Sequence, residues 1–182
     1  MNDYASTILG SGCLLVATPD VKDPHFARAV ILLIAYSLED GAMGLILNRP
    51  LAVDQMDAQS PIASWMESSQ SPSTIFLGGP VETNGYICMT PDCASPSGLR
   101  SVDIELISPV HLDGPHRVFR GYSGWSVGQL EDELTFKSWY VVESRSTDLL
   151  TKSPDKLWNE VLQRQEGPLK RLGLFPSAPE VN

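Results

Sequence analysis

Short apolar runs separated by turn residues make up most of the pattern along this chain. The longest run, Ala29 to Tyr36, is rich in branched side chains and has the length of a buried strand, not of a membrane-spanning helix. Glu39-Asp40-Gly41 follows it as a hairpin turn signal. Further strands are predicted at residues 12–17, 43–47, 74–77, 86–89, 102–107, 117–120 and 139–142. The pattern therefore indicates a sheet of many short strands.

Apolar residues at helical spacing mark three further segments. Each segment begins with a serine that can cap a helix, and the first and last also carry proline at the first helical position. The predicted helices begin at Ser60, Ser126 and Ser153, and Gly167-Pro168 ends the last one. The side chains expected to face the core are Ile62, Trp65 and Met66 in the first helix, Val127, Leu130 and Leu134 in the second, and Leu157, Trp158, Val161 and Leu162 in the third.

The segment between the strand at 117–120 and the helix at Ser126 has a distinctive composition. Gly121-Tyr122-Ser123-Gly124-Trp125 predicts a glycine-hinged aromatic turn, because glycine adopts backbone conformations that other residues resist. Ser126 and Gln129 have the spacing of a capping box, and such a cap usually stabilises a helix by about 1 kcal/mol. Trp125 is expected to be buried and to fix the angle between the strand and the helix.

The order of these elements predicts the fold class. Many short strands joined by hairpin signals, with a few helices between them, are typical of an α+β fold with a mainly antiparallel, strongly curved sheet. No repeat, linker or change in composition divides residues 1–182, so the sequence predicts a single domain. The Pro-containing end, at about residues 175–182, is expected to form a loose tail.

The charge balance limits the possible partners. Thirteen Lys and Arg residues face 22 Asp and Glu residues, which gives a formal net charge of −9. Direct nucleic-acid binding and attachment to an anionic membrane are therefore not expected, because both require clustered positive charge. The first residues lack the basic and apolar regions of a signal peptide. Three cysteines without a Cys-x-x-Cys pair are consistent with a reduced, cytoplasmic protein.

The sequence contains no arrangement of residues that specifies a reaction. His111 and His116 lack further ligands at metal-binding spacing, so neither a metal nor another cofactor is predicted. Ser123 lies in Gly-Tyr-Ser-Gly, which does not match the nucleophile elbow, and is interpreted as a turn serine. Residues 131–133 are consecutive acids that point in different directions, which favours a solvated helix face over a catalytic carboxylate pair. Cys88 is expected to be buried in a strand and Cys93 to lie in an exposed loop.

Two arginines follow or end predicted strands beside turn residues. Asn48-Arg49-Pro50 closes one strand, and Arg120 precedes the aromatic segment. If the strand ends meet, they form a cleft that could bind an anionic or peptide ligand. The simpler interpretation is that both arginines pair with nearby carboxylates. The candidate binding residues are Asn48, Arg49, Gly78, Gly79, Pro80, Arg120, Tyr122 and Trp125.

The motifs in this order resemble the YqgE/AlgH family of bacterial proteins. The resemblance is carried by residues 12–19, 26–33, 44–50, 78–80, 121–125 and 129–131 together with Trp158. It implies a single-domain fold in which a bifurcated sheet forms a pseudo-barrel flanked by helices. It also implies a cytoplasmic protein of unestablished activity, since AlgH-type members are labelled transcriptional regulators because of a regulatory phenotype.

Two functional hypotheses follow. The first is a non-catalytic binding or regulatory protein that acts through an unknown protein partner or small ligand. The alternative is an enzyme of unrecognised type with its site in a cleft at the arginine-bearing strand ends, where a catalytic group would need a displaced pKa. Sequence-specific DNA binding is a third and weaker hypothesis.

Overall fold

The computed structural model describes residues 8–52 and 62–175. The predicted helix start at Ser60 and Pro61, and all of the predicted loose tail beyond residue 175, lie outside the described residues. Within them, no helix combines the length and the apolar character needed to cross a membrane.

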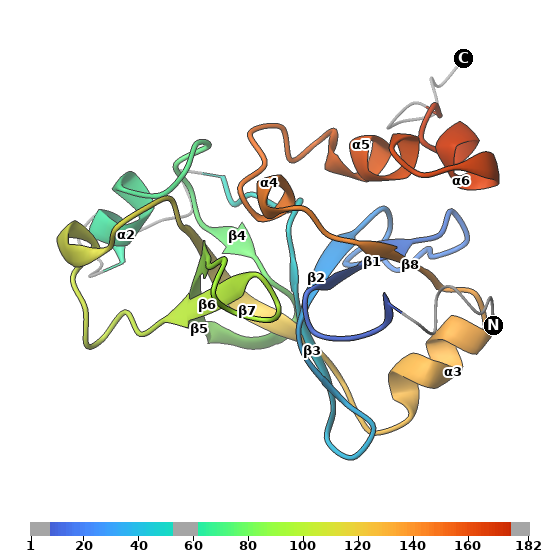
Figure 1. Cartoon of the computed structure of the whole chain (residues 1–182), viewed down its shortest axis with the longest axis horizontal. Coiled ribbons are helices and arrows are strands. Elements are labelled where there is room, and N and C mark those ends of the chain that lie inside the picture. The colour runs from blue at the N-terminus through green and yellow to red at the C-terminus, as the bar shows by residue number, and fades with distance from the viewer. Residues whose placement is uncertain (1–7, 53–61, 176–182) are drawn as a thin grey trace.

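The described chain forms strands and short helices in nearly the predicted order (Figure 1). The strands are β1 (Cys13–Ala17), β2 (Val30–Ser37), β3 (Gly41–Ile46), β4 (Phe76–Leu77), β5 (Val81–Pro91), β6 (Leu99–Val102), β7 (Arg117–Trp125) and β8 (Trp139–Glu143). The helices are α2 (Ala63–Glu67), α3 (Gln129–Thr135), α4 (Ser146–Leu149), α5 (Leu157–Gln163) and α6 (Gly167–Leu172), with a 3₁₀ turn η2 at Pro109–His111.

All strands belong to one sheet that is antiparallel except for the pair β4 and β7. The strand order is β6-β5-β7-β3-β2-β1-β8, and β4 also pairs with β7. The predicted α+β class and mainly antiparallel sheet are therefore confirmed. β6 and β8 remain as open edges of this order, so the strongly curved pseudo-barrel is not confirmed.

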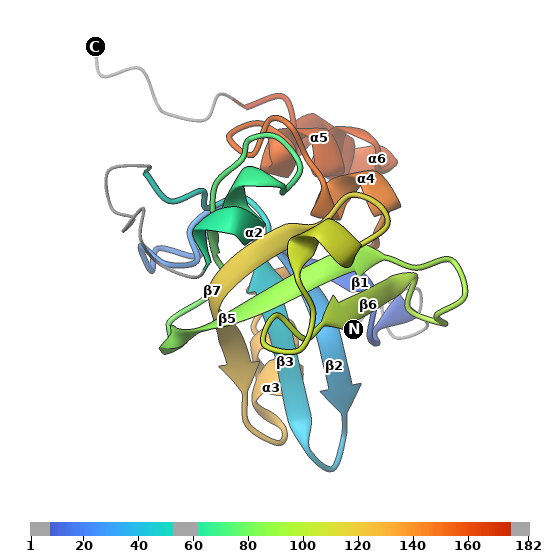
Figure 2. The same ribbon diagram turned by 90° about the vertical axis from the view of Figure 1, so that its left-hand side faces the viewer.

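β7 is the strand at which the sheet divides. Its first half pairs with β5 and, in parallel, with β4, whereas its last three residues pair with β3. β3 and β4 thus pair with successive segments of β7. Figure 2 shows β5 and β7 running at a steep angle across the β2–β3 hairpin. The predicted turn at residues 121–125 is wrong, because this segment continues the strand. Gly121 has φ +67°, a backbone conformation that suits glycine, at the point where the partners change.

The chain passes unusually close to β7 at Gly78 and Gly79. A Cβ atom on Gly78 would lie 2.2 Å from the carbonyl oxygen of Gly121, and one on Gly79 would lie 2.3 Å from the backbone of Tyr122. The Gly78 carbonyl accepts hydrogen bonds from the Ile46 amide and from the Ser123 hydroxyl, at 3.0 Å and 3.1 Å. Ser123 is therefore a buried strand residue and not the predicted turn serine. The glycines are required because only a chain without side chains fits here.

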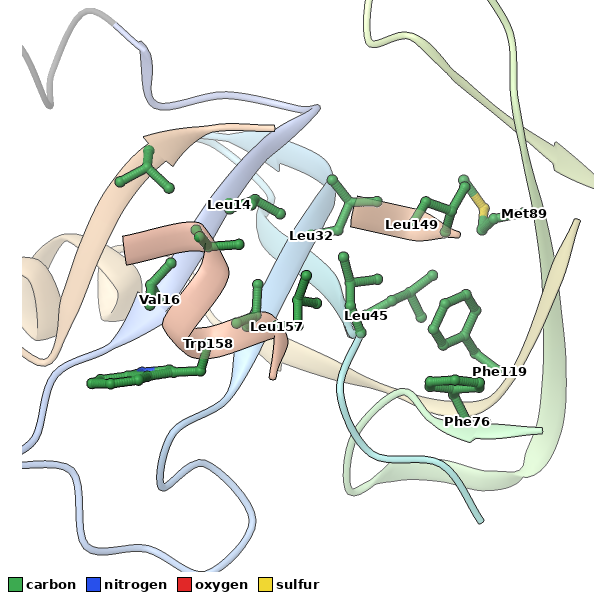
Figure 3. Close-up of a cluster of buried hydrophobic side chains, with 14 of the residues drawn as sticks. Leu14, Val16, Leu32, Leu45, Phe76, Met89, Phe119, Leu149, Leu157 and Trp158 are labelled. Carbon is green, nitrogen blue, oxygen red and sulfur yellow. The ribbon is translucent and has the colours of Figure 1, made fainter. Parts of the chain in front are cut away.

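The core lies on both faces of the central strands. β1 and the first half of β2 are buried throughout, which explains why they read as continuous apolar runs. On one face, side chains of β1, β2 and β3 pack between α5 and the ring pair Phe76–Phe119 (Figure 3). On the other face, Trp125 and Trp139 pack with Leu130 of α3. The predicted buried side of the last long helix is confirmed for all four of its residues.

A fully buried arginine at the start of β7 binds backbone carbonyls of the segments around residues 70–71 and 151. Arg117 donates hydrogen bonds to the carbonyls of Gln70, Ser71 and Thr151, and its guanidinium lies 4.1 Å from the centre of the Phe76 ring. Burial lowers the pKa of Arg117 to about 10. Its Nε and Nη1 have no hydrogen-bond partner in the described part of the chain. Carbonyl oxygens and an aromatic face thus replace the carboxylate that a buried arginine usually pairs with.

Several local predictions are wrong for identifiable reasons. α3 begins after Gly128, which has φ +80°, so the Ser126 hydroxyl does not cap it and Val127 is exposed. The Gln129 side chain still accepts from the Ser126 amide, at 3.1 Å. The strand predicted at 102–107 ends at Val102, because Asp103 forms a turn with the amides that follow it. α5 starts at Leu157 instead of near Ser153, and α6 was not predicted.

We expect Gly78→Ala to destabilise the fold because its methyl group would collide with backbone atoms that cannot move aside. The free energy of unfolding, measured by denaturant titration, should fall by about 1–3 kcal/mol or more. Gly10→Ala is the matched control, since a Cβ atom there would meet no atom within 4 Å. Equal stability of the two variants would contradict the proposed close approach.

We expect Cys93 to react with iodoacetamide well before Cys88. Cys93 is exposed, whereas Cys88 is buried and burial raises its pKa to about 12. Because this folded-state pKa lies above the ordinary value of 9.0, the Cys88 thiol stabilises the fold below pH 9 and loses this contribution as the pH rises towards 12. Mass spectrometry after brief labelling at pH 8 measures the order, and earlier modification of Cys88 would contradict it.

Candidate functional site

Asn48 and Arg49 hold the chain segment that joins β1 to β2. The Asn48 side chain accepts from the Val30 amide at 3.0 Å and donates to the Arg28 carbonyl at 2.9 Å. Arg49 donates to the carbonyl of Ala27, and burial lowers its pKa. These contacts explain why the polar pair follows an apolar strand: it satisfies backbone groups at the strand end.

Gly78 lies between the main chains of the two candidate arginines. The Leu77 amide donates to the Arg49 carbonyl at 2.8 Å, and the Gly78 amide donates to the Arg120 carbonyl at 2.9 Å. The Arg120 Nε atom is buried without a hydrogen-bond partner in the described part of the chain. Neither arginine makes an ion pair with a described residue. Asp54 and Asp57, the carboxylates nearest to Arg49 in the sequence, lie outside the described residues, so the predicted carboxylate pairing stays a prediction. Arg120 lies within β7 and not at a strand end.

Tyr122 and Trp125 line an open groove of about 500 Å³ between β7 and the β2–β3 hairpin. The rest of its wall comes mainly from residues 35–43 and Val81. Pro80, next to Val81, is exposed and does not line the groove. Two of the predicted residues thus meet here, while Asn48, Arg49 and Arg120 line other parts of the molecule.

Two of the three acidic residues of α3, Glu131 and Glu133, are structural acceptors and not part of the predicted solvated face, whereas Asp132 is exposed as expected. Glu133 accepts from the indole nitrogens of Trp125 and Trp139, at 2.9 Å and 2.7 Å. Glu131 accepts from the Tyr36 hydroxyl at 2.7 Å. Burial, together with the hydrogen bond to Glu131, raises the pKa of Tyr36 to about 12. The two carboxylates therefore fix α3 to three strands.

A second cavity, of about 580 Å³, lies beside β1 and the C-terminal helices. One side is formed by Thr18, Pro19, Val21, Lys22, Ala27 and Arg28, in the segment between β1 and β2. The other side is formed by Trp158 of α5, Leu172 of α6 and Phe175. The volume is in the range that holds small-molecule ligands, and the wall is mostly apolar.

The cavity wall contains a backbone conformation that is rare for a side-chain-bearing residue. Arg28 has φ +57°, and its guanidinium carbon lies 4.4 Å above the centre of the Trp158 ring. The Trp158 indole donates to the Ala17 carbonyl at 2.9 Å, which fixes the ring. Strained residues of this kind gather at ligand sites, where surrounding contacts hold them in place. Here Asn48 and Arg49 provide those contacts through the carbonyls of Arg28 and Ala27.

One buried polar group in this wall lacks a partner. The Thr18 side chain is 3% exposed, and its hydroxyl makes no hydrogen bond within the described part of the chain. Lys22 is exposed and its ammonium donates to the Pro19 carbonyl at 2.8 Å. Among the described residues no group of His, Cys, Asp and Glu side chains could hold a metal ion.

Sequence reasoning did not find this cavity. The sequence places Trp158 on the buried side of a helix and, like Arg28, among the residues of the family resemblance, but it assigns a binding role to neither of them nor to Lys22. Of the predicted binding residues, Asn48 and Arg49 are related to the cavity, because their side chains bind the carbonyls of Arg28 and Ala27 in its wall.

Comparisons with known proteins place the chain in a family. The sequence profile of a family described as AlgH-like (DUF179) matches residues 14–170. The chain belongs to the AlgH-like family. A UPF0301 protein from Streptomyces coelicolor is 41% identical to this AlgH-like chain, over 94% of it and 95% of that protein. A UPF0301 protein from Thermobifida fusca is 35% identical with the same shares covered.

Two solved structures share the AlgH-like fold. The crystal structure of protein DIP2367 from Corynebacterium diphtheriae superposes with a TM-score of 0.76, at 26% identity, over 91% of this chain and 92% of that one. The solution structure of the AlgH protein from Pseudomonas aeruginosa gives a TM-score of 0.66 at 25% identity, over 91% and 94%. The predicted resemblance to the YqgE/AlgH family is thus confirmed.

We expect Trp125→Ala to cost far more stability than Ser126→Ala. Trp125 is 6% exposed, packs edge-on against Trp139 with ring centres 6.1 Å apart, and donates to Glu133. Its truncation should lower the free energy of unfolding by about 3–5 kcal/mol. Because Ser126 makes no side-chain cap, its substitution should cost less than about 0.5 kcal/mol. Denaturant midpoints measure both, and similar losses would contradict this account.

Proposed function

We propose that this AlgH-like protein is a non-catalytic, cytoplasmic binding protein that holds a small ligand in the cavity between Trp158 and the Thr18–Arg28 segment. The observation that carries this proposal is the left-handed backbone of Arg28, whose guanidinium lies over the Trp158 ring. The side chains of the buried Asn48 and the half-buried Arg49 hold this backbone through the carbonyls of Arg28 and Ala27. A stabilised but strained residue in the wall of a ligand-sized cavity is the arrangement expected of a binding site.

Two further observations support this proposal. Within the described part of the chain the buried Thr18 hydroxyl has no hydrogen-bond partner, which is uncommon in folded proteins. Cys13, Cys88 and Cys93 are all free thiols, in keeping with a reducing compartment. A bound ligand would contact both the β1–β2 segment and the C-terminal helices. Ligand binding could thereby be transmitted to a protein partner, in keeping with the regulatory label of AlgH-type relatives.

The alternative hypothesis, an enzyme, requires that the side chains of Arg49 and Arg120 share a cleft. Arg49 instead binds carbonyls behind the cavity wall, and neither arginine lines the cavity or the groove at Tyr122. No contact among the described residues therefore favours the enzyme over the binding protein.

Filling the cavity should abolish ligand retention. The protein is purified from its own cells, and the released small molecules are analysed by mass spectrometry. Wild-type protein and the control Ala94→Phe, in an exposed loop, should carry the same enriched compound. Ala27→Phe places a ring in the cavity and should lose it.

Retention of the compound by Ala27→Phe, or the absence of any enriched compound, would contradict the proposed binding site. A separate measurement tests whether the protein is non-catalytic. The compound should be recovered chemically unchanged after prolonged incubation with the protein. Chemical conversion of the compound would favour the enzyme.

A further inference from the structure

We infer that the ligand of this cavity is a neutral hydrophobic molecule, held by apolar contact between Phe175 and the side formed by Pro19 and Val21, without recognition of charge. This inference rests on the proposed function and adds the chemical class of the ligand. It follows from two features of the cavity wall. Its cations have partners within the protein, and an aromatic side chain is held in an exposed position at its edge.

Lys22 gives the cavity no excess positive charge. Its ammonium donates to the Pro19 carbonyl at 2.8 Å, and Asp20 and Asp23 lie on either side of it in the chain. All three charged residues are exposed, so their charges are screened by water and offset one another. An anionic ligand group would therefore gain little from this lysine.

The other polar groups of the wall also do not favour a charged ligand. The Arg28 guanidinium lies over the Trp158 ring, and Arg28 takes part in a further interaction. The Trp158 indole donates to the Ala17 carbonyl. The Thr18 hydroxyl has no partner in the described part of the chain, but it is neutral. A charged ligand group would thus leave water without gaining a partner of opposite charge, which is costly.

Phe175 is exposed at the cavity wall although its backbone is held in place. The Phe175 amide donates to the Leu172 carbonyl at 3.1 Å, and the Asn159 side chain donates to the carbonyls of Gly173 and Phe175, at 2.9 Å and 2.7 Å. Phe175 is nevertheless 60% exposed. A large aromatic side chain that is fixed at the edge of an apolar cavity and open to water indicates a surface that an apolar molecule covers.

Apolar side chains are available on both sides of the cavity. On the side of the β1–β2 segment, Pro19 is exposed and Val21 and Ala27 are half-buried. On the other side, the half-buried Leu172 lies with Phe175. These side chains offer contact area and no hydrogen bond, so the removal of apolar surface from water is the main source of binding free energy. A neutral hydrophobic molecule makes use of both sides.

The test compares three probes that share one carbon skeleton and differ in charge at pH 7. They are 4-phenylbutan-1-ol, which is neutral, 4-phenylbutyrate, which is anionic, and 4-phenylbutylamine, which is cationic. Calorimetric titration of the full chain measures each affinity, and ¹H–¹⁵N spectra locate binding through the amide signals of Val21, Ala27 and Leu172. We expect the alcohol to bind about tenfold more tightly than either charged probe, because burial of an ion without a new partner is unfavourable. Its binding should also show a negative heat-capacity change, which marks the burial of apolar surface.

Substitution of the exposed ring should weaken binding selectively. Phe175→Ala should lower the affinity for the alcohol about five- to tenfold, because it removes the aromatic contact surface. Leu174→Ala is the matched control, since Leu174 is the neighbouring residue, is 70% exposed and does not line the cavity. It should leave the affinity unchanged. Lys22→Gln should leave the order of the three affinities unchanged. Because all three residues are exposed, these substitutions should leave the rest of the spectrum in place.

The outcomes separate the ligand class from the site itself. Equal affinities for the three probes, or tighter binding of a charged probe, would overturn the neutral class while leaving a binding cavity. An equal effect of Phe175→Ala and Leu174→Ala would overturn the assigned contact with Phe175. If no probe binds up to its solubility limit, this inference is wrong, whereas the retention of a cellular compound, tested with Ala27→Phe, decides the proposed function separately.

Discussion

The close approach of Gly78 and Gly79 to β7 is the constraint on which the rest of the structure depends. It lets the backbone of the β4–β5 connection lie against Gly121 and Tyr122, so that β3 and β4 can pair with the same strand one after the other. Any side chain at Gly78 would separate these strands. The division of the sheet, and with it the placement of the core on both faces, follows from two residues that have no side chain.

The polar side chains of Asn48, which is buried, and Arg49, which is half-buried, then determine the shape of the candidate site. Asn48 and Arg49 occupy the end of the strand segment after β3 and bind the backbone of the β1–β2 segment. Arg117 has a similar role at the start of β7, where it binds three loop carbonyls. In both places an arginine whose described hydrogen-bond partners are carbonyl oxygens orders irregular backbone, because buried backbone groups are costly to leave unpaired.

Neither the family nor the fold defines the chemistry of this protein, because fold alone does not imply function. What the structure adds is a particular cavity in which a strained cation, an aromatic ring and an exposed lysine converge. Its two sides come from opposite ends of the chain. Binding there would link the β1–β2 segment to the C-terminal helices, which gives a physical route from a small ligand to a change at the protein surface.

The sequence by itself determined the α+β class, most strands and the buried side of α5, because hydrophobic period and turn residues are local signals. It failed at Gly121–Trp125, where glycines that suggested a turn instead permit close packing of backbones. It also could not bring Lys22 and Arg28 together with Trp158, since residues so far apart in the chain share no local pattern. Only the tertiary structure decided that contact, because the packing of α5 against β1 sets the distance between them.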